Sequence, residues 1–184
     1  MTPSPSTSHW VHLALGSNIS PRRKYIEDAI SLLRKRFPGG FRTSKKYVAR
    51  AYQDSSQSDY LNCCVRFETS LPPRTVLEIV LDMEKRLGRV RDGIKWSART
   101  IDIDILLHGP LVVDTSDLKI PHYDLEQRDF FIVPLLELEQ TLVHPKTGKS
   151  LRLALGAIPR KLRTDPKIAS DVKKESIDIA IDSF

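Results

Sequence analysis

Apolar residues recur at strand and helix periods in a fixed order between Trp10 and Leu107, and this order limits the folds open to the chain. The elements expected there are strands at residues 10–15, 41–52, 61–69 and 101–107 and helices at residues 21–37 and 72–87. The order strand, helix, strand, strand, helix, strand is typical of a ferredoxin-like βαββαβ core. We therefore predict an α+β fold whose mainly antiparallel sheet carries helices on one face. A short strand at residues 111–115 and a helix within residues 125–140 are expected to follow.

The chain of 184 residues has a net charge of +6, which indicates an anionic partner without distinguishing nucleic acid, nucleotide and membrane surface. Its length fits one domain. No apolar run approaches the roughly 18 residues of a membrane span. We expect a flexible lead-in at residues 1–9, a single domain at residues 10–155 and a C-terminal extension of unknown role at residues 156–184.

The two cysteines, Cys63 and Cys64, are adjacent in an expected strand. Neighbouring residues of a strand point to opposite faces, so these thiols are not placed to pair. The chain has neither a disulfide framework nor a CxxC zinc signature, and this predicts a reducing compartment such as the cytoplasm.

The strongest local feature is the pair Asp102 and Asp104 within an alternating apolar run. Residues i and i+2 of a strand share a face and lie about 6.6 Å apart along the chain. Two carboxylates at this spacing can bind one or two hard cations, and Mg²⁺ typically uses such carboxylates together with substrate phosphates. A bare pair of this kind is more often a solvated strand face, so its context decides between the two interpretations.

That context is a basic stretch from Lys85 to Arg99, which holds six basic residues and one acidic residue. Guanidinium groups bind phosphates bidentately, and a cationic loop beside paired carboxylates suits phosphoryl transfer. Trp96 within the stretch is costly to expose and is more useful stacked on a planar ligand. The alternative is an ordinary solvated loop.

Further candidates flank this stretch. His122 and Tyr123, with Arg128 and Phe130 after them, form a cluster suited to the ribose and phosphates of a nucleotide. The chain has no GxxxxGK[ST] or GxGxxG motif, so phosphate binding of the P-loop or Rossmann kind is excluded.

Tyr60 and Asn62 offer a stacking face and a paired donor and acceptor, which suit a flat heterocycle with amide-like edges. A packing role at the start of a strand is the alternative for this pair.

In combination these motifs resemble those of the 6-hydroxymethyl-7,8-dihydropterin pyrophosphokinase family. The segments that carry the resemblance are Leu15-Gly16-Ser17-Asn18, Asp59-Tyr60-Leu61-Asn62, Gly88-Arg89-Val90-Arg91, Trp96, Arg99-Thr100-Ile101-Asp102-Ile103-Asp104 and Pro121-His122-Tyr123 with Arg128 and Phe130. The resemblance covers residues 10–155, which would form the pyrophosphokinase domain.

The resemblance implies a three-layer αβα arrangement around the ferredoxin-like core. It also implies transfer of the β,γ-diphosphate of ATP to a hydroxymethyl-dihydropterin, with release of AMP, in cytoplasmic folate biosynthesis. ATP would be the cosubstrate, with two Mg²⁺ ions as cofactors. We expect small-molecule substrates, no nucleic acid or membrane partner, a monomer, and association with other folate enzymes as a further option.

The resemblance also implies roles for individual residues. Catalytic roles would fall to Arg89, Arg99, Asp102 and Asp104, and the two aspartates would hold the metal ions. ATP would be bound by Glu84, Arg91, Lys95, Trp96, Ile105, His122, Tyr123 and Arg128. The pterin would be bound by Tyr60, Asn62, Trp96 and Phe130.

The chain departs from the family pattern at Ala49-Arg50, Lys95 and Ser97-Ala98, and these departures bear on pterin fit and rate. One alternative is therefore a catalytically impaired paralogue that binds ATP or pterin. Another is an RNA-binding module of the same element order. The expected strand at residues 61–69 argues against it, because this strand lacks the stacking aromatics of an RNA-recognition motif.

Overall fold

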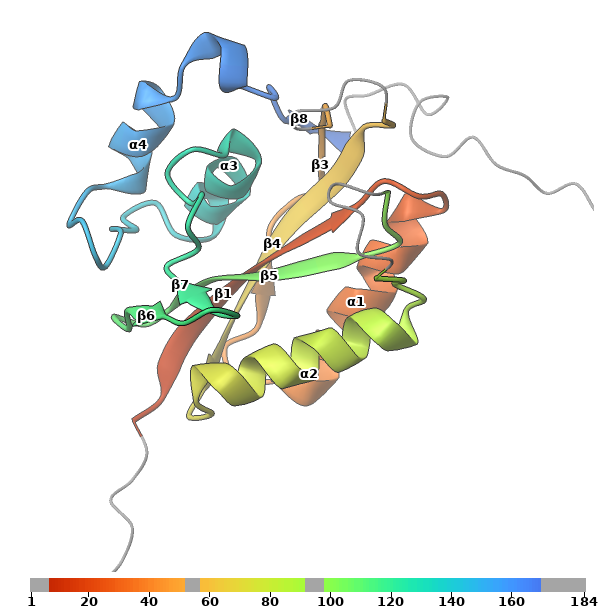
Figure 1. Cartoon of the computed structure of the whole chain (residues 1–184), viewed down its shortest axis with the longest axis horizontal. Coiled ribbons are helices and arrows are strands. Elements are labelled where there is room, and N and C mark those ends of the chain that lie inside the picture. The colour runs from red at the N-terminus through yellow and green to blue at the C-terminus, as the bar shows by residue number, and fades with distance from the viewer. Residues whose placement is uncertain (1–6, 52–56, 92–97, 170–184) are drawn as a thin grey trace, which may run out of the picture.

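The computed structural model of the chain describes residues 7–51, 57–91 and 98–169 (Figure 1). The strands are β1 (His9–Ser17), β2 (Arg42–Thr43), β3 (Tyr47–Ala49), β4 (Tyr60–Thr69), β5 (Asp102–His108), β6 (Val113–Asp114), β7 (Lys119–Ile120) and β8 (Lys167–Ile168). The helices are α1 (Arg22–Arg36), α2 (Pro73–Arg86), α3 (Asp129–Leu138), α4 (Leu151–Ala157) and the 3₁₀ helix η1 (Arg160–Leu162). No helix of the described residues is long and apolar enough to cross a membrane.

A mainly antiparallel sheet organises the chain. Its strand order is β5-β1-β4-β3-β8, with β2 also paired to β4, and β6 and β7 form a separate pair. β1 lies between β5 and β4 and is antiparallel to both. β1 therefore lies between β4 and β5, which are separated in the sequence by α2. Side chains from these three strands meet on each face of the sheet.

Apolar side chains fill both faces of the sheet. One cluster joins alternate residues of β1, β4 and β5 to the buried sides of α1 and α2. A second cluster on the opposite face joins Ala14, Cys64 and Leu106 to α3 and α4. Figure 1 shows α1 and α2 on one side of the sheet and α3 and α4 on the other. The prediction from element order of helices on one face only is thus wrong, because the chain after β5 supplies a second covering layer.

Because both faces of the sheet are covered, the two adjacent cysteines lie in different apolar clusters. Cys63 belongs to the cluster with α1 and α2, whereas Cys64 belongs to the cluster with α3, and both are free thiols. The prediction that they do not pair is confirmed. β4 is therefore buried on both faces, since Cys64 is fully buried beneath Phe131.

The strand expected at residues 41–52 is divided into β2 and β3. At Ser44, which lies between them, the hydroxyl accepts a hydrogen bond from Cys64 N at 2.9 Å while Ser44 N donates to Cys64 O at 2.9 Å. The Ser44 hydroxyl thus replaces a backbone carbonyl as the hydrogen-bond acceptor for Cys64 N. The register against β4 shifts by one residue between β2 and β3. Alternation in the sequence does not reveal such a bulge.

The helices begin and end near the positions that their sequences predict. α2 starts at Pro73, where a missing N–H costs nothing, and is followed by Gly88 at φ +80°. α3 contains Pro134 in its interior, within the range in which a helix is expected. Beyond residue 155 the chain completes α4, then forms η1 and β8.

Candidate active site

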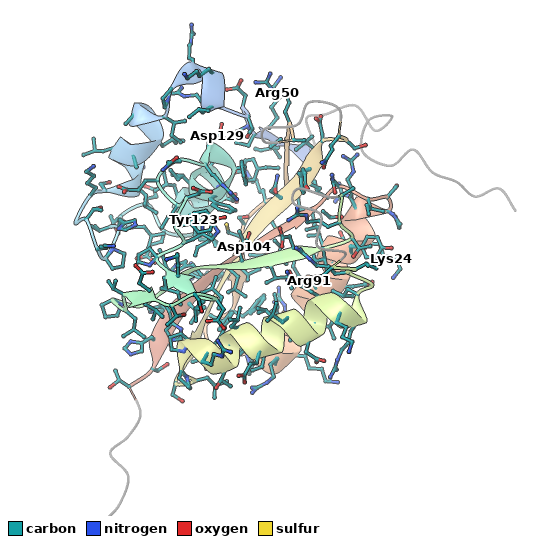
Figure 2. The ribbon with its side chains drawn as sticks, in the orientation of Figure 1. Lys24, Arg50, Arg91, Asp104, Tyr123 and Asp129 are labelled. Carbon is teal, nitrogen blue, oxygen red and sulfur yellow. The ribbon has the colours of Figure 1, made fainter. Side chains whose placement is uncertain are left out.

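The two aspartates of β5 lie in rows that cross the centre of the sheet. Asp102 pairs with Gly16 of β1, which pairs in turn with Asn62 of β4. Asp104 lies in the next row of the same face, opposite Ala14. Ile103, between them, points into the opposite cluster with α1 and α2. The predicted geometry of two carboxylates on one strand face is therefore present, and Figure 2 labels Asp104 on β5 near the middle of the molecule.

Asp102 is held between two arginines. Arg99 Nη1 donates to Asp102 Oδ2 at 2.5 Å, and Arg89 Nη1 forms a short ion pair with Asp102 Oδ1. Burial alone would raise the pKa of Asp102, but the two guanidinium groups outweigh it and hold the pKa below its usual value. Asp102 is thus a stable anion whose charge is balanced within the site.

Asp104 differs from its neighbour. Within the described part of the chain it has no hydrogen-bond or ion-pair partner, and Arg128 acts on it only at longer range. Burial, reinforced by repulsion from Asp102, raises the pKa of Asp104 to about 8. A half-buried carboxylate of this kind is stabilised by any cation that enters. Its hard oxygen atoms beside those of Asp102 form a donor set that fits Mg²⁺.

Glu84 at the end of α2 lies beneath the arginines and is 1% exposed. One carboxylate oxygen accepts from Ile103 N at 2.7 Å and pairs with Arg89 at 3.3 Å, and the other pairs with Arg91. Burial and the nearby Asp102 raise the pKa of Glu84. These contacts tie α2 to β5 and orient two of the site's guanidinium groups.

Two pockets meet at the aspartates. The small pocket, of about 560 Å³, is lined by Leu15, Gly16, Arg50, Tyr60, Asn62, Phe130 and others. The large pocket, of about 1760 Å³ including open solvent, is lined by Arg74, Arg89, Arg91, Lys119, His122, Tyr123 and others. Four residues line both, namely Arg99, Asp102, Asp104 and Arg128.

The small pocket combines a flat apolar lining with an unsatisfied donor. Asn62 is 7% exposed, and its Nδ2 is buried without a hydrogen-bond partner in the described residues. Gly16 leaves this space free, since a Cβ there would lie 3.0 Å from Asn62 Oδ1 and 3.6 Å from Tyr60 Cδ1. Burial also raises the pKa of the Tyr60 phenol, which therefore stays protonated. This pocket fits a planar ligand that accepts a hydrogen bond at its edge.

The residues before α3 border the large pocket. His122 stacks on Tyr123 with ring centroids 4.4 Å apart, and its Nδ1 accepts from Asp124 N at 3.1 Å. Burial, with repulsion from Arg128, lowers the pKa of His122 to about 3, so the imidazole is neutral at physiological pH. Tyr123, labelled in Figure 2, lines the large pocket and is 64% exposed. These residues can form hydrogen bonds and stacking contacts without adding charge.

The backbone of Arg99 is held by Asn18, a residue for which no individual role was predicted from the sequence. Asn18 Oδ1 accepts from Arg99 N at 2.8 Å, and Asn18 N donates to Arg99 O at 3.2 Å. Asn18 is 5% exposed, and its Nδ2 donates to Gln57 at 3.0 Å. The turn after β1 therefore fixes the backbone of Arg99. The asparagine of the Gly16-Ser17-Asn18 segment was the sequence signal from which this contact could have been inferred.

The structure brings most of the predicted site residues together. The large pocket is lined by Glu84, Arg89, Arg91, Arg99, Asp102, Asp104, Ile105, His122, Tyr123 and Arg128, and the small pocket by Tyr60, Asn62 and Phe130. Ile105 is only 5% exposed and packs mainly in the cluster with α1 and α2. Lys95, Trp96 and Ser97 lie outside the described residues. Arg50, one of the departures from the family pattern that bear on pterin fit, lines the small pocket.

Known proteins match the chain over most of its length. The family of 7,8-dihydro-6-hydroxymethylpterin-pyrophosphokinases matches residues 12–140, well over half of the chain. The chain belongs to this pyrophosphokinase family. It is 42% identical over 142 residues to the 2-amino-4-hydroxy-6-hydroxymethyldihydropteridine pyrophosphokinase of Aquifex aeolicus, covering 77% of this chain and 88% of the relative. It is 35% identical over 153 residues to the pyrophosphokinase of the same name from Synechocystis sp., covering 82% of this chain and 76% of the relative.

Solved structures agree at the level of the fold. The crystal structure of Plasmodium falciparum HPPK-DHPS A437G with STZ-DHP superposes with a TM-score of 0.65 and 13% identity. The superposition covers 84% of this chain and 46% of that one, so the pyrophosphokinase-family chain spans less than half of the solved protein.

Proposed function

We propose that this chain transfers the β,γ-diphosphate of ATP to the hydroxymethyl oxygen of 6-hydroxymethyl-7,8-dihydropterin and releases AMP, a step of folate synthesis. Family membership makes the chain an enzyme, a pyrophosphokinase. The observation that carries the substrate assignment is the meeting of two unlike pockets at Asp102 and Asp104. A reaction between two substrates requires such a junction, at which their reacting atoms can approach.

The small pocket would hold the pterin. Its buried and unpartnered Asn62 Nδ2 needs an acceptor, and the carbonyl and ring nitrogens of a pterin supply acceptors at the edge of a flat ring. Tyr60 and Phe130 would offer aromatic faces to that ring. We infer that the pterin lies with its hydroxymethyl group toward Asp104, at the mouth that the two pockets share.

The large pocket would hold ATP. Arg89, Arg91, Arg99 and Arg128 line it and provide the fixed positive charge that a triphosphate requires. The neutral His122 and the exposed ring of Tyr123 would contact the nucleoside part. Lys95 and Trp96 remain predicted ATP ligands, and Trp96 a predicted pterin ligand, on sequence grounds.

Asp102 and Asp104 would hold Mg²⁺, and we propose two ions because the carboxylate pair faces both pockets. When bound, the metal would neutralise charge on the transferred phosphates. The fit rests on Asp104, whose half-buried carboxylate has no ion-pair partner among the described residues and feels the arginines only at longer range. Arg89 and Arg99 keep Asp102 ionised for the same task.

The chemistry is displacement at phosphorus. The hydroxymethyl oxygen forms a bond to the β-phosphorus, the bond from that phosphorus to the α–β bridging oxygen breaks, the hydroxyl proton is released and AMP leaves. Arg99 lines both pockets, so it can follow the diphosphate from donor to acceptor. The side chains act by positioning the substrates and balancing their charge rather than by forming a covalent intermediate.

We also propose that the core is ferredoxin-like within a three-layer αβα domain. The antiparallel order β5-β1-β4-β3 and the helices on both faces support this assignment. A monomeric state, association with other folate enzymes and a cytoplasmic location stay predictions.

The decisive experiment measures nucleotide products from ATP and Mg²⁺, with and without 6-hydroxymethyl-7,8-dihydropterin. We expect one AMP per pterin consumed and no AMP without pterin. Asp102→Asn should lower turnover by about 10²–10³-fold through loss of electrostatic stabilisation, whereas the exposed Asp114→Asn on β6 should not. ADP as the product would assign a simple kinase instead, and wild-type turnover in Asp102→Asn would refute the metal assignment.

A further inference from the structure

A segment beyond the family match contacts residues that line or adjoin the small pocket. We call residues 158–169 the strap; it lies wholly beyond the end of the match at residue 140. Ile158 is 4% exposed in the cluster with α3 and α4, and Ala169 is 4% exposed in the cluster on the other face. Between these anchors β8 pairs with β3, and Ala169 N donates to Lys46 O at 2.8 Å. The strap thus crosses the edge of the sheet and belongs to both layers.

The centre of the strap is hydrogen-bonded to the first turn of α3 through the carboxylate of Asp129. Thr164 Oγ1 donates to Asp129 Oδ1 at 2.6 Å, while Thr164 N and Asp165 N donate to Asp129 Oδ2 at 2.8 Å and 3.0 Å. Asp129 is 2% exposed and Thr164 is 5% exposed. Asp129 stands between Arg128 and Phe130 in the chain, and both of these line the small pocket.

The strap also holds a second lining residue of the small pocket. Arg50 Nη2 donates to Arg163 O at 3.1 Å and lies 3.4 Å from Asp165 Oδ2. Arg50 follows β3 and is one of the positions at which the chain departs from its family pattern. Figure 2 shows Arg50 and Asp129 toward the end of the molecule where Figure 1 places β8.

We propose that the strap supports the wall of the pterin pocket from outside it, with Thr164 and Asp129 as positioning residues for Phe130 and with Arg50 as a specificity-determining residue of that pocket. This inference rests on the proposed function for the identity of the ligand. Arg128, which lines both pockets, has an independent anchor in its ion pair with Asp124 at 2.5 Å, whereas Phe130 and Arg50 line only the small pocket. Pterin binding is therefore more sensitive to the strap than ATP binding.

The test removes one hydrogen bond without a change of shape. Thr164→Val leaves Asp129 Oδ1 without its hydroxyl donor, whereas Thr164→Ser retains the donor. We expect Thr164→Val to raise the KM for the pterin by about tenfold, the effect of one hydrogen bond to a charged group, and to change the KM for ATP by less than about twofold. Thr164→Ser should restore the wild-type KM. The exposed Lys161→Ala in the same strap is the matched control and should match wild type.

A second measurement needs no turnover. Hydrogen exchange of the backbone amides in residues 129–133 should be faster in Thr164→Val than in wild type without any ligand present. Arg50→Ala should raise the pterin KM and leave this exchange unchanged, because the hydrogen bond and ion pair given for Arg50 in the described residues go to the strap and not to α3.

The outcomes separate the two proposals. If wild type releases no AMP while Thr164→Val still speeds exchange at residues 129–133, the proposed function fails and the strap stands. If wild type is active but Thr164→Val and Arg50→Ala keep the wild-type pterin KM, the inference is overturned. Equal increases in the KM for pterin and for ATP in Thr164→Val would also overturn it, since they would indicate a general structural defect.

Discussion

Asp102 and Asp104 project from the same face of β5 yet have opposite electrostatic environments. Asp102 lies between Arg89 and Arg99, which lower its pKa, whereas burial and Asp102 itself raise the pKa of Asp104 to about 8. Identical residue types two positions apart therefore divide the work of the site. One carboxylate is fixed as an anion by the protein, and the other becomes a stable anion only when a cation is supplied.

This contrast predicts a stability effect for Asp104→Asn. Because the folded pKa exceeds the unfolded value, folded Asp104 keeps a proton that the unfolded chain has lost between about pH 4 and pH 8. Its contribution to stability is thus present below pH 4 and is lost as the pH rises toward 8. Without Mg²⁺, Asp104→Asn should raise the free energy of unfolding at pH 8 by at least ~1 kcal/mol and abolish AMP release. Urea titrations at pH 5 and pH 8 measure this, and a destabilised variant at pH 8 would contradict it.

Arg99→Lys tests geometry at constant charge. Arg99 pairs with Asp102 and lines both pockets, so its planar fork can serve a carboxylate and a phosphate together, whereas lysine offers a single point charge. We expect kcat to fall by about 10–10²-fold with a smaller change in ATP affinity. Single-turnover rates and ATP titrations separate the two effects. An unchanged rate with weaker ATP binding would reverse the assigned role.

At the scale of elements, β1 opens the small pocket by lacking a side chain at one position. Gly16 lies between Asn62 of β4 and Asp102 of β5 in a row across the sheet. β1 is buried along almost its whole length, so a neighbour cannot simply move outward when atoms are added.

Gly16→Ala should therefore narrow the pterin pocket selectively. The new Cβ would lie 3.0 Å from Asn62 Oδ1, tighter than ordinary van der Waals contact. We expect the KM for the pterin to rise by about tenfold or more and the KM for ATP to change little. Gly156→Ala in α4, where nothing lies within 4 Å of a new Cβ, is the control and should stay active. Equal effects on both substrates would place the pterin elsewhere.

At the scale of the whole molecule, histidines that are buried in the neutral form lower the free energy of unfolding as the pH becomes acidic. His12 of β1 is 3% exposed, and burial together with Arg66 lowers its pKa to about 4. In the unfolded chain this histidine binds a proton as the pH falls below about 6.5, whereas in the folded chain it stays neutral until about pH 4. Stability from this group is therefore complete above pH 6.5 and is lost as the pH falls toward 4.

His12→Phe should remove part of this acid sensitivity. Between pH 7 and pH 5, His12 lowers the free energy of unfolding by about 2 kcal/mol in wild type, and the variant should lose correspondingly less. Urea unfolding at the two pH values measures the difference, with Lys161→Ala as a control that keeps the wild-type slope. Identical slopes in His12→Phe and wild type would show that His12 does not set the acid limit.

Much of the fold and of the site was predictable because the signals are local in the chain. Strand and helix periods place β1, α1, β4, α2 and β5, and the i, i+2 spacing fixes a common face for Asp102 and Asp104. The bulge at Ser44 was not predictable, since a side-chain hydroxyl replaces a backbone partner there. The burial of Cys64 was not predictable either, because the helix that covers it, α3, comes much later in the chain.

The sequence by itself determined the order of the elements, the chemistry of the carboxylates and arginines, and the family. Only the tertiary structure decided how charge is distributed among them, since pKa values depend on burial and on partners from distant elements, such as Arg89 beside Asp102. It also placed the strap beside Asp129 and Arg50. The hydrogen bonds from Thr164 and Asp165 to Asp129 join positions 35 and 36 residues apart, and no periodicity records a contact made across the edge of a sheet.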